Sequence, residues 1–415
     1  MSRRALLGLV LLAPLAAAVP HVAASPADTH ALRPAVTVGS LGNEPLVRAA
    51  PDGTLYVSAL QHLYVSTNSG RSWTLSKGSA YSESANLASD SSIQVDATGR
   101  LYQSFDFPYA GSTAVCTSDD RAVTFSCNPA VLPGGTDRMW LAVKDRTTSY
   151  VVTNEGLYQS VFATSTDRGA TYVPGQTAGS VAEPTDGPLL VSPRTGKVVQ
   201  PIIDNLTNQT ATTNFESGTG LLRVYTPGVA SPVAVETRPI PLTAGGALPG
   251  AAYGRDGTLW VSSEKAVRSG GKITSVRVTV ARSKDDGLTW TVLPPVTTTG
   301  TSTFVALGAG RAGHVGLVFY RTAAAGDPGV VPAGTAWDAV YAETTDGLST
   351  RPHWSLSTVE KTVHRGVICA TAGCMGSGRF AGDFLDTSFD ARDRPVLVWQ
   401  RDTSTIPQVR FTTAR

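Results

Sequence analysis

The amino-acid sequence predicts an all-β protein, a β-propeller of four-stranded antiparallel blades, with seven blades favoured and six as the alternative. Two repeats predict this fold. One is an octapeptide that occurs four times, and the other is a pair of apolar segments joined by a polar turn. The second repeat recurs every 45 to 60 residues or so, roughly the length of a four-stranded blade. The 41 Gly and 26 Pro interrupt the chain at short intervals, so long helices are not expected.

The octapeptide follows the pattern Ser-x-Asp-x-Gly-x-Thr-aromatic and is typical of a tight turn between two strands. Its Ser and Asp accept hydrogen bonds from backbone amides, its Gly adopts a positive φ, and its aromatic residue begins the next strand and packs against the neighbouring sheet. Asn68 replaces the Asp in the first copy and keeps an acceptor oxygen. Ala122 replaces the Gly in the second copy, which predicts that this turn is the least regular. The structural positions are Ser66, Asn68, Gly70, Trp73, Ser118, Asp120, Phe125, Ser165, Asp167, Gly169, Tyr172, Ser283, Asp285, Gly287 and Trp290.

The second repeat counts the blades, because the octapeptide marks only one hairpin of each unit. It predicts seven units, at residues 46–57, 93–102, 141–152, 189–199, 251–261, 305–319 and 384–399. The fourth unit has no octapeptide, and if that region is an elaborated loop the protein has six blades. The last unit lacks a strand, which we expect Ala35 to Val38 to supply, so that the two ends of the chain close the ring. Residues 35–415 then form one domain.

The first 24 residues predict a secretory signal peptide. Arg3 and Arg4 precede an apolar run from Ala5 to Val19, and the small residues that end at Ala24 suit a signal peptidase. The run is shorter than the roughly 20 apolar residues of a membrane span. We therefore expect a secreted, extracellular monomer with a flexible tail at residues 25–34 and no membrane contact after cleavage. The other interpretation is an uncleaved N-terminal anchor.

Charge and cysteine content restrict the partners and cofactors further. The net charge of +2 and the lack of a Lys/Arg cluster argue against nucleic acid as a partner. All four Cys lie in the exported part of the chain, so disulfides are expected. Of the three possible connectivities we favour the local pairs, Cys116 with Cys127 and Cys369 with Cys374. The spacings lack a Cys-x-x-Cys, which argues against a zinc site made by these cysteines.

With both repeats in place, the chain resembles the Asp-box, or BNR-repeat, propellers, whose best-known members are the sialidases. The resemblance covers nearly all of the chain after its N-terminus. Related boxes occur in other glycosidases and in propellers that are not enzymes, and the sialidases themselves have six blades. The resemblance therefore implies a fold and two classes of function, recognition of an extracellular glycan or protein and hydrolysis of a glycoside.

The sialidase resemblance also implies a set of site residues. Exo-sialidases bind the substrate carboxylate with three arginines, the first in an Arg-Ile-Pro motif, because guanidinium and carboxylate pair in a bidentate manner. They also use a Tyr nucleophile assisted by a Glu, and an Asp as acid and base. In this chain Asn43, Glu44 and Pro45 stand where the motif is expected, so Asn43 replaces the arginine. Arg48 lies within the strand rather than at its mouth.

Acidic residues recur at or near the start of the first strand of successive units, where a propeller brings them to one end of its central channel. The expected binding residues are Asn43, Glu44, Asp90, Asp137, Arg138, Asp186, Arg365, Arg379 and Asp383. No cofactor is required, but a partial ring of carboxylates would suit Ca²⁺ near Asp90, Asp137 and Asp383. Two carboxylates could also act as the acid and the base of a glycosidase. The other interpretation is that each of them caps backbone amides where a loop enters the inner strand.

Candidate catalytic residues come from the same ring and from the end of the chain, where a sialidase has its Tyr and its last Arg. They are Glu44, Asp137, Asp383, Tyr320 and Arg321. The Gly-rich loop at residues 363–382 is expected to touch a bound ligand, because such loops line the working face of a rigid scaffold. The favoured function is recognition of an extracellular carbohydrate or protein through the channel mouth. The alternative is a glycoside hydrolase, exo-sialidase-like or of another type, that uses the channel-mouth carboxylates.

Overall fold

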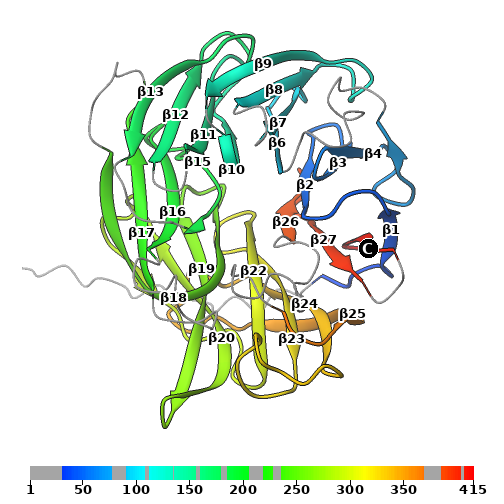
Figure 1. Cartoon of the computed structure of the whole chain (residues 1–415), viewed down its shortest axis with the longest axis vertical. Helices are drawn as coiled ribbons and strands as arrows, with labels where there is room; N and C mark the ends of the chain where they lie inside the picture. Colours follow the sequence, from blue (N-terminus) through cyan, green and yellow to red (C-terminus); the bar gives the residue numbers. More distant parts are fainter. Residues whose placement is uncertain are drawn as a thin grey trace, which may run out of the picture.

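The protein is a seven-bladed β-propeller, as Figure 1 shows for the computed structural model. The structure describes residues 30–76, 90–107, 112–133, 135–155, 159–178, 185–204, 218–227, 235–368, 385–402 and 406–415. None of these residues is helical. Accordingly, this part of the chain has no helix with the length and hydropathy of a membrane span. The predicted all-β class and the favoured blade number are confirmed.

The first three blades each use four consecutive strands of the chain. Blade 1 consists of β2 (Pro45–Ala49), β3 (Leu55–Ala59), β4 (His62–Ser66) and β5 (Thr74–Leu75). Blade 2 consists of β6 (Ser91–Val95), β7 (Leu101–Phe107), β8 (Ser112–Ser118) and β9 (Ser126–Pro133). Blade 3 consists of β10 (Gly135–Val143), β11 (Ser149–Glu155), β12 (Gln159–Ser165) and β13 (Val173–Ala178).

The next two blades share one long strand. Blade 4 consists of β14 (Thr185–Asp186) and β15 (Leu190–Val191), then β16 (Val198–Asp204), β17 (Gly218–Tyr225) and the first part of β18 (Glu236–Tyr253). Blade 5 consists of the last part of β18 with β19 (Leu259–Ser269), β20 (Lys272–Ser283) and β21 (Thr291–Val292). The fourth unit is thus a blade although it has no octapeptide, which decides between seven blades and six.

The last two blades bring the chain back to its beginning. Blade 6 consists of β22 (Thr301–Ala309), β23 (Val315–Thr322), β24 (Ala336–Thr344) and β25 (Ser355–Arg365). Blade 7 consists of β26 (Asp386–Phe389), β27 (Pro395–Arg401), β28 (Gln408–Thr413) and, from the other end of the chain, β1 (Val36–Gly39). β1 pairs antiparallel with β28, so the predicted closure of the ring by an N-terminal strand is confirmed.

The octapeptide turns join the third and fourth strands of their blades and are held by local hydrogen bonds. In the copy of blade 3, the Ser165 hydroxyl accepts the Gly169 amide at 2.9 Å, and the Asp167 carboxylate accepts the Thr171 amide at 2.9 Å. Because strands alternate in direction, these turns lie on the same face as the turns between the first and second strands. We call this side of the ring the octapeptide face, and the side where the first strands begin the channel-mouth face.

The prediction that the turn with Ala122 would be the least regular is wrong. Ala122 adopts φ 64°, close to the 81° of Gly169 at the equivalent position. Its amide donates to the Ser118 hydroxyl at 2.9 Å, as the glycine amides of the other copies do. The hydrogen bonds of the turn therefore impose the left-handed conformation even where the residue has a side chain that opposes it.

One of the two predicted disulfides lies in the described part of the chain. Cys116 of β8 is bonded to Cys127 of β9, which confirms this pair. The disulfide joins the two strands that flank the octapeptide of blade 2. Cys369 and Cys374 lie outside the described residues.

Candidate functional site

A cavity of about 310 Å³ lies at the centre of the ring, and we call it the channel cavity. All seven blades contribute to its wall, mostly through their first strands. The lining residues include Leu46, Arg48, Gln94, Trp140, Pro188, Leu190, Tyr253, Leu307, Leu385, Asp386, Thr387 and Ser388. Its volume is at the lower end of the range of small-molecule pockets, roughly 300 to 1,000 Å³. A small ligand is therefore the appropriate occupant.

A hydrogen-bonded polar cluster of three side chains stands in this mostly apolar wall. Arg48 of β2 donates from Nε to Gln94 Oε1 at 3.1 Å and from Nη1 to Asp386 Oδ2 at 2.5 Å. Asp386, the first residue of β26, also accepts the amides of Val47 and Thr387, each at 2.9 Å. The cluster connects blades 1, 2 and 7, so its geometry depends on how these three blades pack.

The polar cluster is partly desolvated and still has hydrogen-bonding capacity. Burial raises the pKa of the Asp386 carboxyl, although the Arg48 guanidinium and the two amides oppose this rise. The side chains of Arg48 and Asp386 are 18% and 12% exposed. Among the described residues, Arg48 finds acceptors for Nε and Nη1 but none for Nη2. The Nη2 group is thus available to an acceptor on a ligand in the channel cavity.

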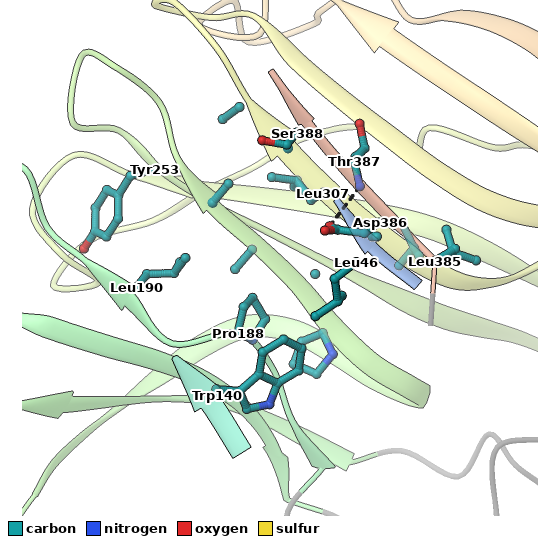
Figure 2. Close-up of a pocket in the computed structure, with 18 of the residues that line it drawn as sticks. Leu46, Trp140, Pro188, Leu190, Tyr253, Leu307, Leu385, Asp386, Thr387 and Ser388 are labelled. Carbon is teal, nitrogen blue, oxygen red and sulfur yellow. Dashed lines mark hydrogen bonds between the residues drawn. The ribbon is translucent and has the colours of Figure 1, made fainter. Parts of the chain in front are cut away.

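Trp140 of β10 contributes an indole ring to the wall, and Figure 2 shows it beside Leu46 and Pro188. Its Nε1 donates to the backbone carbonyl of Asp186 at 3.2 Å, which fixes the orientation of the ring. In Figure 2 Asp386 and Thr387 lie beyond Leu46, while Tyr253 lies on the far side of the cavity. The Tyr253 hydroxyl donates to Asp286 at 2.8 Å.

A buried carboxyl group lies behind the wall formed by β22. Glu264 of β19 is 1% exposed, and Thr303 donates to its Oε2 at 3.1 Å. Burial raises its pKa to about 8, although hydrogen bonds from Thr303 and from the amides of Phe304 and Val305 lower it. Phe304 and Val305 line the channel cavity, and Phe304 has the unusual φ of 56°. Glu264 therefore supports an irregular segment of the cavity wall in its protonated form near neutral pH.

The described residues among those predicted at the channel mouth do not share one environment. Asn43 and Glu44 are half-buried and precede β2, and Glu44 has a φ of 55°. Asp90 is half-buried and precedes β6. Asp186 is 3% exposed, and Arg223 approaches its carboxylate at 3.5 Å, so this acid forms a buried ion pair. None of these four residues is among those that line the channel cavity.

The side chains of four other predicted residues lie outside the described part of the protein. Asp137 and Arg138 lie in β10, and only their backbone is described. Arg379 and Asp383 lie outside the described residues. Calcium binding near Asp90, Asp137 and Asp383 therefore stays a prediction.

The candidates from the end of the chain lie on blade 6 and are not among the residues that line the channel cavity. Tyr320 is 1% exposed, its hydroxyl is hydrogen-bonded to the backbone of Gln400, and burial raises its pKa far above the usual range. Arg321 donates to Thr299 at 2.8 Å. Arg365 is exposed and donates to the Gly334 carbonyl at 3.2 Å. A Tyr nucleophile needs its phenolate stabilised, and the environment of Tyr320 does the opposite.

Sequence reasoning missed the polar cluster and Glu264. Arg48 lies within a strand rather than at its mouth, yet in a propeller the middle of a first strand is the part that lines the channel. The sequence does contain a signal for Arg48. It lies two residues after Leu46, and therefore on the same face of an otherwise apolar first strand. For Asp386 and Glu264 the sequence contains no comparable signal, because their partners lie in other blades.

No family model matches the chain, and no curated protein matches its sequence. Solved structures that are similar to it include an α-L-arabinanase from Penicillium chrysogenum, with 11% identity over 77% of this chain and 92% of that chain and a TM-score of 0.46. A Hadza microbial sialidase is 14% identical over 88% of this chain and 74% of that chain, with a TM-score of 0.47. A protein of unknown function from Dyadobacter fermentans is 10% identical over 92% of this chain and 99% of that chain, also with a TM-score of 0.47. Glycosidases are thus among the similar structures, but similarity at this level does not extend to a site.

Proposed function

We propose that this chain is a secreted propeller of the sialidase-like Asp-box type that binds a carbohydrate in its channel cavity. One observation carries the proposal: the indole of Trp140 and the polar cluster of Arg48, Gln94 and Asp386 line the same cavity. A sugar ring has an apolar C–H face and a rim of hydroxyl groups. An aromatic side chain suits the first, and a few charged or amide groups in an apolar pocket suit the second.

The charge of the polar cluster favours a neutral sugar over a sialic acid. The Arg48 guanidinium already pairs with the Asp386 carboxylate, so it provides little uncompensated positive charge for a substrate carboxylate. Arg48 is also the only Arg among the described residues that line the cavity. Hydroxyl groups can still accept from Arg48 Nη2 and donate to Asp386, as neutral ligands do in mixed polar pockets.

The number of carboxylates in the cavity supports binding rather than hydrolysis. Asp386 is the one carboxylate among the described lining residues, whereas a glycosidase of the usual kind needs two. A second candidate function, glycoside hydrolysis, has one observation in its favour. Burial raises the pKa of Asp386, and a raised pKa suits a general acid that protonates a leaving oxygen. A channel-mouth acid such as Glu44 or Asp137 would then have to act as the base.

The test combines a binding assay with a turnover assay on the same purified protein. Isothermal titration calorimetry with neutral and sialylated oligosaccharides chosen from a glycan array measures Kd, and a panel of fluorogenic glycosides measures turnover. Arg48→Gln removes the guanidinium of the polar cluster. Arg410→Gln is the matched control, because Arg410 also pairs with a carboxylate, Glu360, and its side chain is 13% exposed, but it lies outside the cavity wall.

We expect Arg48→Gln to weaken binding of a neutral sugar by about 10- to 100-fold, since a charged hydrogen bond contributes about 1.5 to 3 kcal/mol. Arg410→Gln should leave Kd unchanged. Equal losses in both variants would contradict the assignment of the site. Turnover of a fluorogenic glycoside that disappears in Asp386→Asn would instead favour the hydrolase. Binding of a protein but no glycan would exclude the sugar as ligand.

Three further properties belong to the proposal. If the chain is secreted and residues 1–24 are removed, the protein recovered from the culture medium should begin at Ser25, which N-terminal sequencing would show. A monomer would appear in light scattering. Calcium at the channel mouth would appear as Ca²⁺ uptake that Asp90→Asn reduces; an unchanged uptake would contradict that site.

A further inference from the structure

A second group of chemistry-bearing side chains lies on the octapeptide face, apart from the channel cavity. His30 precedes β1, His314 lies in the turn between β22 and β23, and Glu343 lies near the end of β24. One ligand atom of each lies within 4.8 Å of the others. Glu343 Oε1 is 2.8 Å from His30 Nδ1 and 2.8 Å from His314 Nε2. Three potential metal ligands from distant parts of the sequence therefore converge on one point.

The orientation of His314 is fixed by a carboxylate behind it. Asp393, in the turn between β26 and β27, lies 2.6 Å from His314 Nδ1, and the Arg311 amide donates to Asp393 at 2.8 Å. A carboxylate at one ring nitrogen holds the proton there and directs the other nitrogen towards a metal, which is how proteins orient most histidine ligands. Here Nε2, the nitrogen that faces Glu343, is the one left for an ion.

Burial separates this group from an ordinary surface cluster. His314 is 0% exposed and Glu343 is 2% exposed, whereas the His30 side chain is 29% exposed. The His314 ring packs edge-on against the Phe389 ring, with 4.4 Å between the ring centroids. On its other contact, the His30 ring stacks on the His314 ring with the centroids 5.5 Å apart. Two ligands are therefore rigid, and the third closes over them from the N-terminal segment.

We propose that His30, His314 and Glu343 bind one divalent transition-metal ion of the zinc class, with Asp393 positioning His314. Two imidazoles and one carboxylate are a ligand set that Zn²⁺ accepts, with water at the remaining position. Ca²⁺ and Mg²⁺ are excluded as the preferred ions, because they require sets of oxygen ligands.

The proposed ion would fasten the N-terminal segment near the closure of the ring. Directly after His30, the Arg415 amide donates to the Ala31 carbonyl at 2.9 Å, and Leu32 forms a β-bridge with Ala414. His314 and Glu343 belong to blade 6, whereas this pairing extends blade 7. One ion would thus tie the segment that begins at His30, and that pairs along blade 7, to blade 6. The site is independent of the proposed sugar binding.

The test uses the whole mature chain, with any polyhistidine tag removed because the tag binds the same ions. After treatment with a chelator and dialysis, Zn²⁺, Ca²⁺ and Mg²⁺ are each titrated by calorimetry, and the bound metal is counted by mass spectrometry. We expect one Zn²⁺ per chain, no Ca²⁺ or Mg²⁺ uptake that depends on His30, and a rise of Tm with Zn²⁺ concentration, since an ion that binds only the folded state stabilises it.

Variants decide whether the ion lies at this cluster. His30→Ala leaves the buried residues intact and should reduce Zn²⁺ affinity by about 100-fold, the loss of one ligand among several. Asp393→Asn should reduce it by about 10- to 100-fold, as loss of an orienting carboxylate does. His353→Ala is the matched control, because His353 is an exposed His near the same face of blade 6.

An unchanged Zn²⁺ affinity in His30→Ala, or an equal loss in His353→Ala, would overturn the proposal. Absence of stoichiometric Zn²⁺ binding by the original chain would overturn it as well, and would leave the cluster as hydrogen bonds that hold the N-terminal segment. Sugar binding should be the same in His30→Ala and in the original chain, so failure here is distinguishable from failure of the proposed function.

Discussion

Replacing Glu264 with Gln should change how the stability of the protein depends on pH. Glu264 is buried behind Phe304 and Val305 of the cavity wall, and burial raises its pKa from 4.5 to about 8. A carboxyl group with a raised pKa is protonated in the folded state over a range where the unfolded chain has already released the proton. The folded state therefore loses stability as the pH rises from about 4.5 to about 8, and a Gln at this position does not titrate.

The size of the effect follows from the two pKa values. Each unit of difference corresponds to about 1.4 kcal/mol, so the folded chain should lose about 3 kcal/mol between pH 4.5 and pH 7 relative to the variant. Below pH 4.5 this contribution is absent, and above pH 8 it is constant. Glu264 Oε1 has no hydrogen-bond partner among the described residues, so the two donors of a Gln amide at that position would add a pH-independent cost. The slope with pH, rather than the absolute stability, is therefore the quantity to compare.

The assay is urea denaturation of both proteins at pH 5, 6, 7 and 8, followed by tryptophan fluorescence. Thermal midpoints provide a second readout, with about 1 to 2 °C expected for each kcal/mol in a chain of this length. Glu236→Gln is the control, because Glu236 is half exposed and hydrogen bonds from Arg238 lower its pKa. The contribution of Glu236 to stability changes only below about pH 4.5, because its pKa is lowered from 4.5. The stability of the control should therefore depend on pH in the same way as that of the original chain from pH 5 to pH 8.

Parallel stability curves for Glu264→Gln and the original chain between pH 5 and pH 8 would refute the reasoning. Such curves would mean that the Glu264 carboxyl group is ionised in the folded state over this pH range, because water or a partner stabilises its charge. A slope of the opposite sign would mean that the amides of Phe304 and Val305 outweigh burial.

Four other variants test the fold and the cavity. Replacing both Cys116 and Cys127 by Ser should lower the free energy of unfolding by about 3 kcal/mol, the value for a short closed loop, and a loss under 1 kcal/mol in urea denaturation would contradict this. Gly169→Ala should lower the free energy of unfolding by about 1 to 2 kcal/mol, because a side chain at φ 81° is strained. Ala122→Gly should leave that free energy nearly unchanged, because the relief of strain offsets the loss of a buried methyl group. Equal effects of the two variants in the same assay would contradict both expectations. Trp140→Phe should weaken sugar binding in calorimetry by about tenfold through loss of ring area and of the bond to a backbone carbonyl, and an unchanged Kd would place the sugar elsewhere.

The blades could be predicted from sequence because their turns are determined locally. The hydrogen bonds that hold the blade 3 turn join Ser165 to Gly169 and Asp167 to Thr171, all within eight consecutive residues. A pattern of that length is visible in the sequence each time it recurs. The same local bonds explain the error at Ala122, since they stabilise the turn enough to hold a residue with a side chain at positive φ.

The site could not be predicted in the same way because its contacts are far apart in sequence. Arg48 and Asp386, which form the ion pair of the channel cavity, are separated by 338 residues. His30 and Glu343 are separated by 313 residues. The sequence shows that acidic residues recur near the starts of first strands, but not which of them are neutralised. Asp186 is one such acid, and only the structure reveals its pairing with Arg223.

The position of the polar cluster connects the candidate site with the way the ring closes. Arg48 belongs to blade 1 and Asp386 to blade 7, so their ion pair spans the junction between the first and last blades. Blade 7 is complete only when β1 pairs with β28, and Trp73 of blade 1 packs on Phe411 of β28 at the same junction. A ligand that bridges Arg48 and Asp386 would therefore bind only the closed ring and stabilise it. Of the two clusters that we assign to ligands, the one in the channel spans the junction of the first and last blades, and the one at His30 holds the segment that leads into β1.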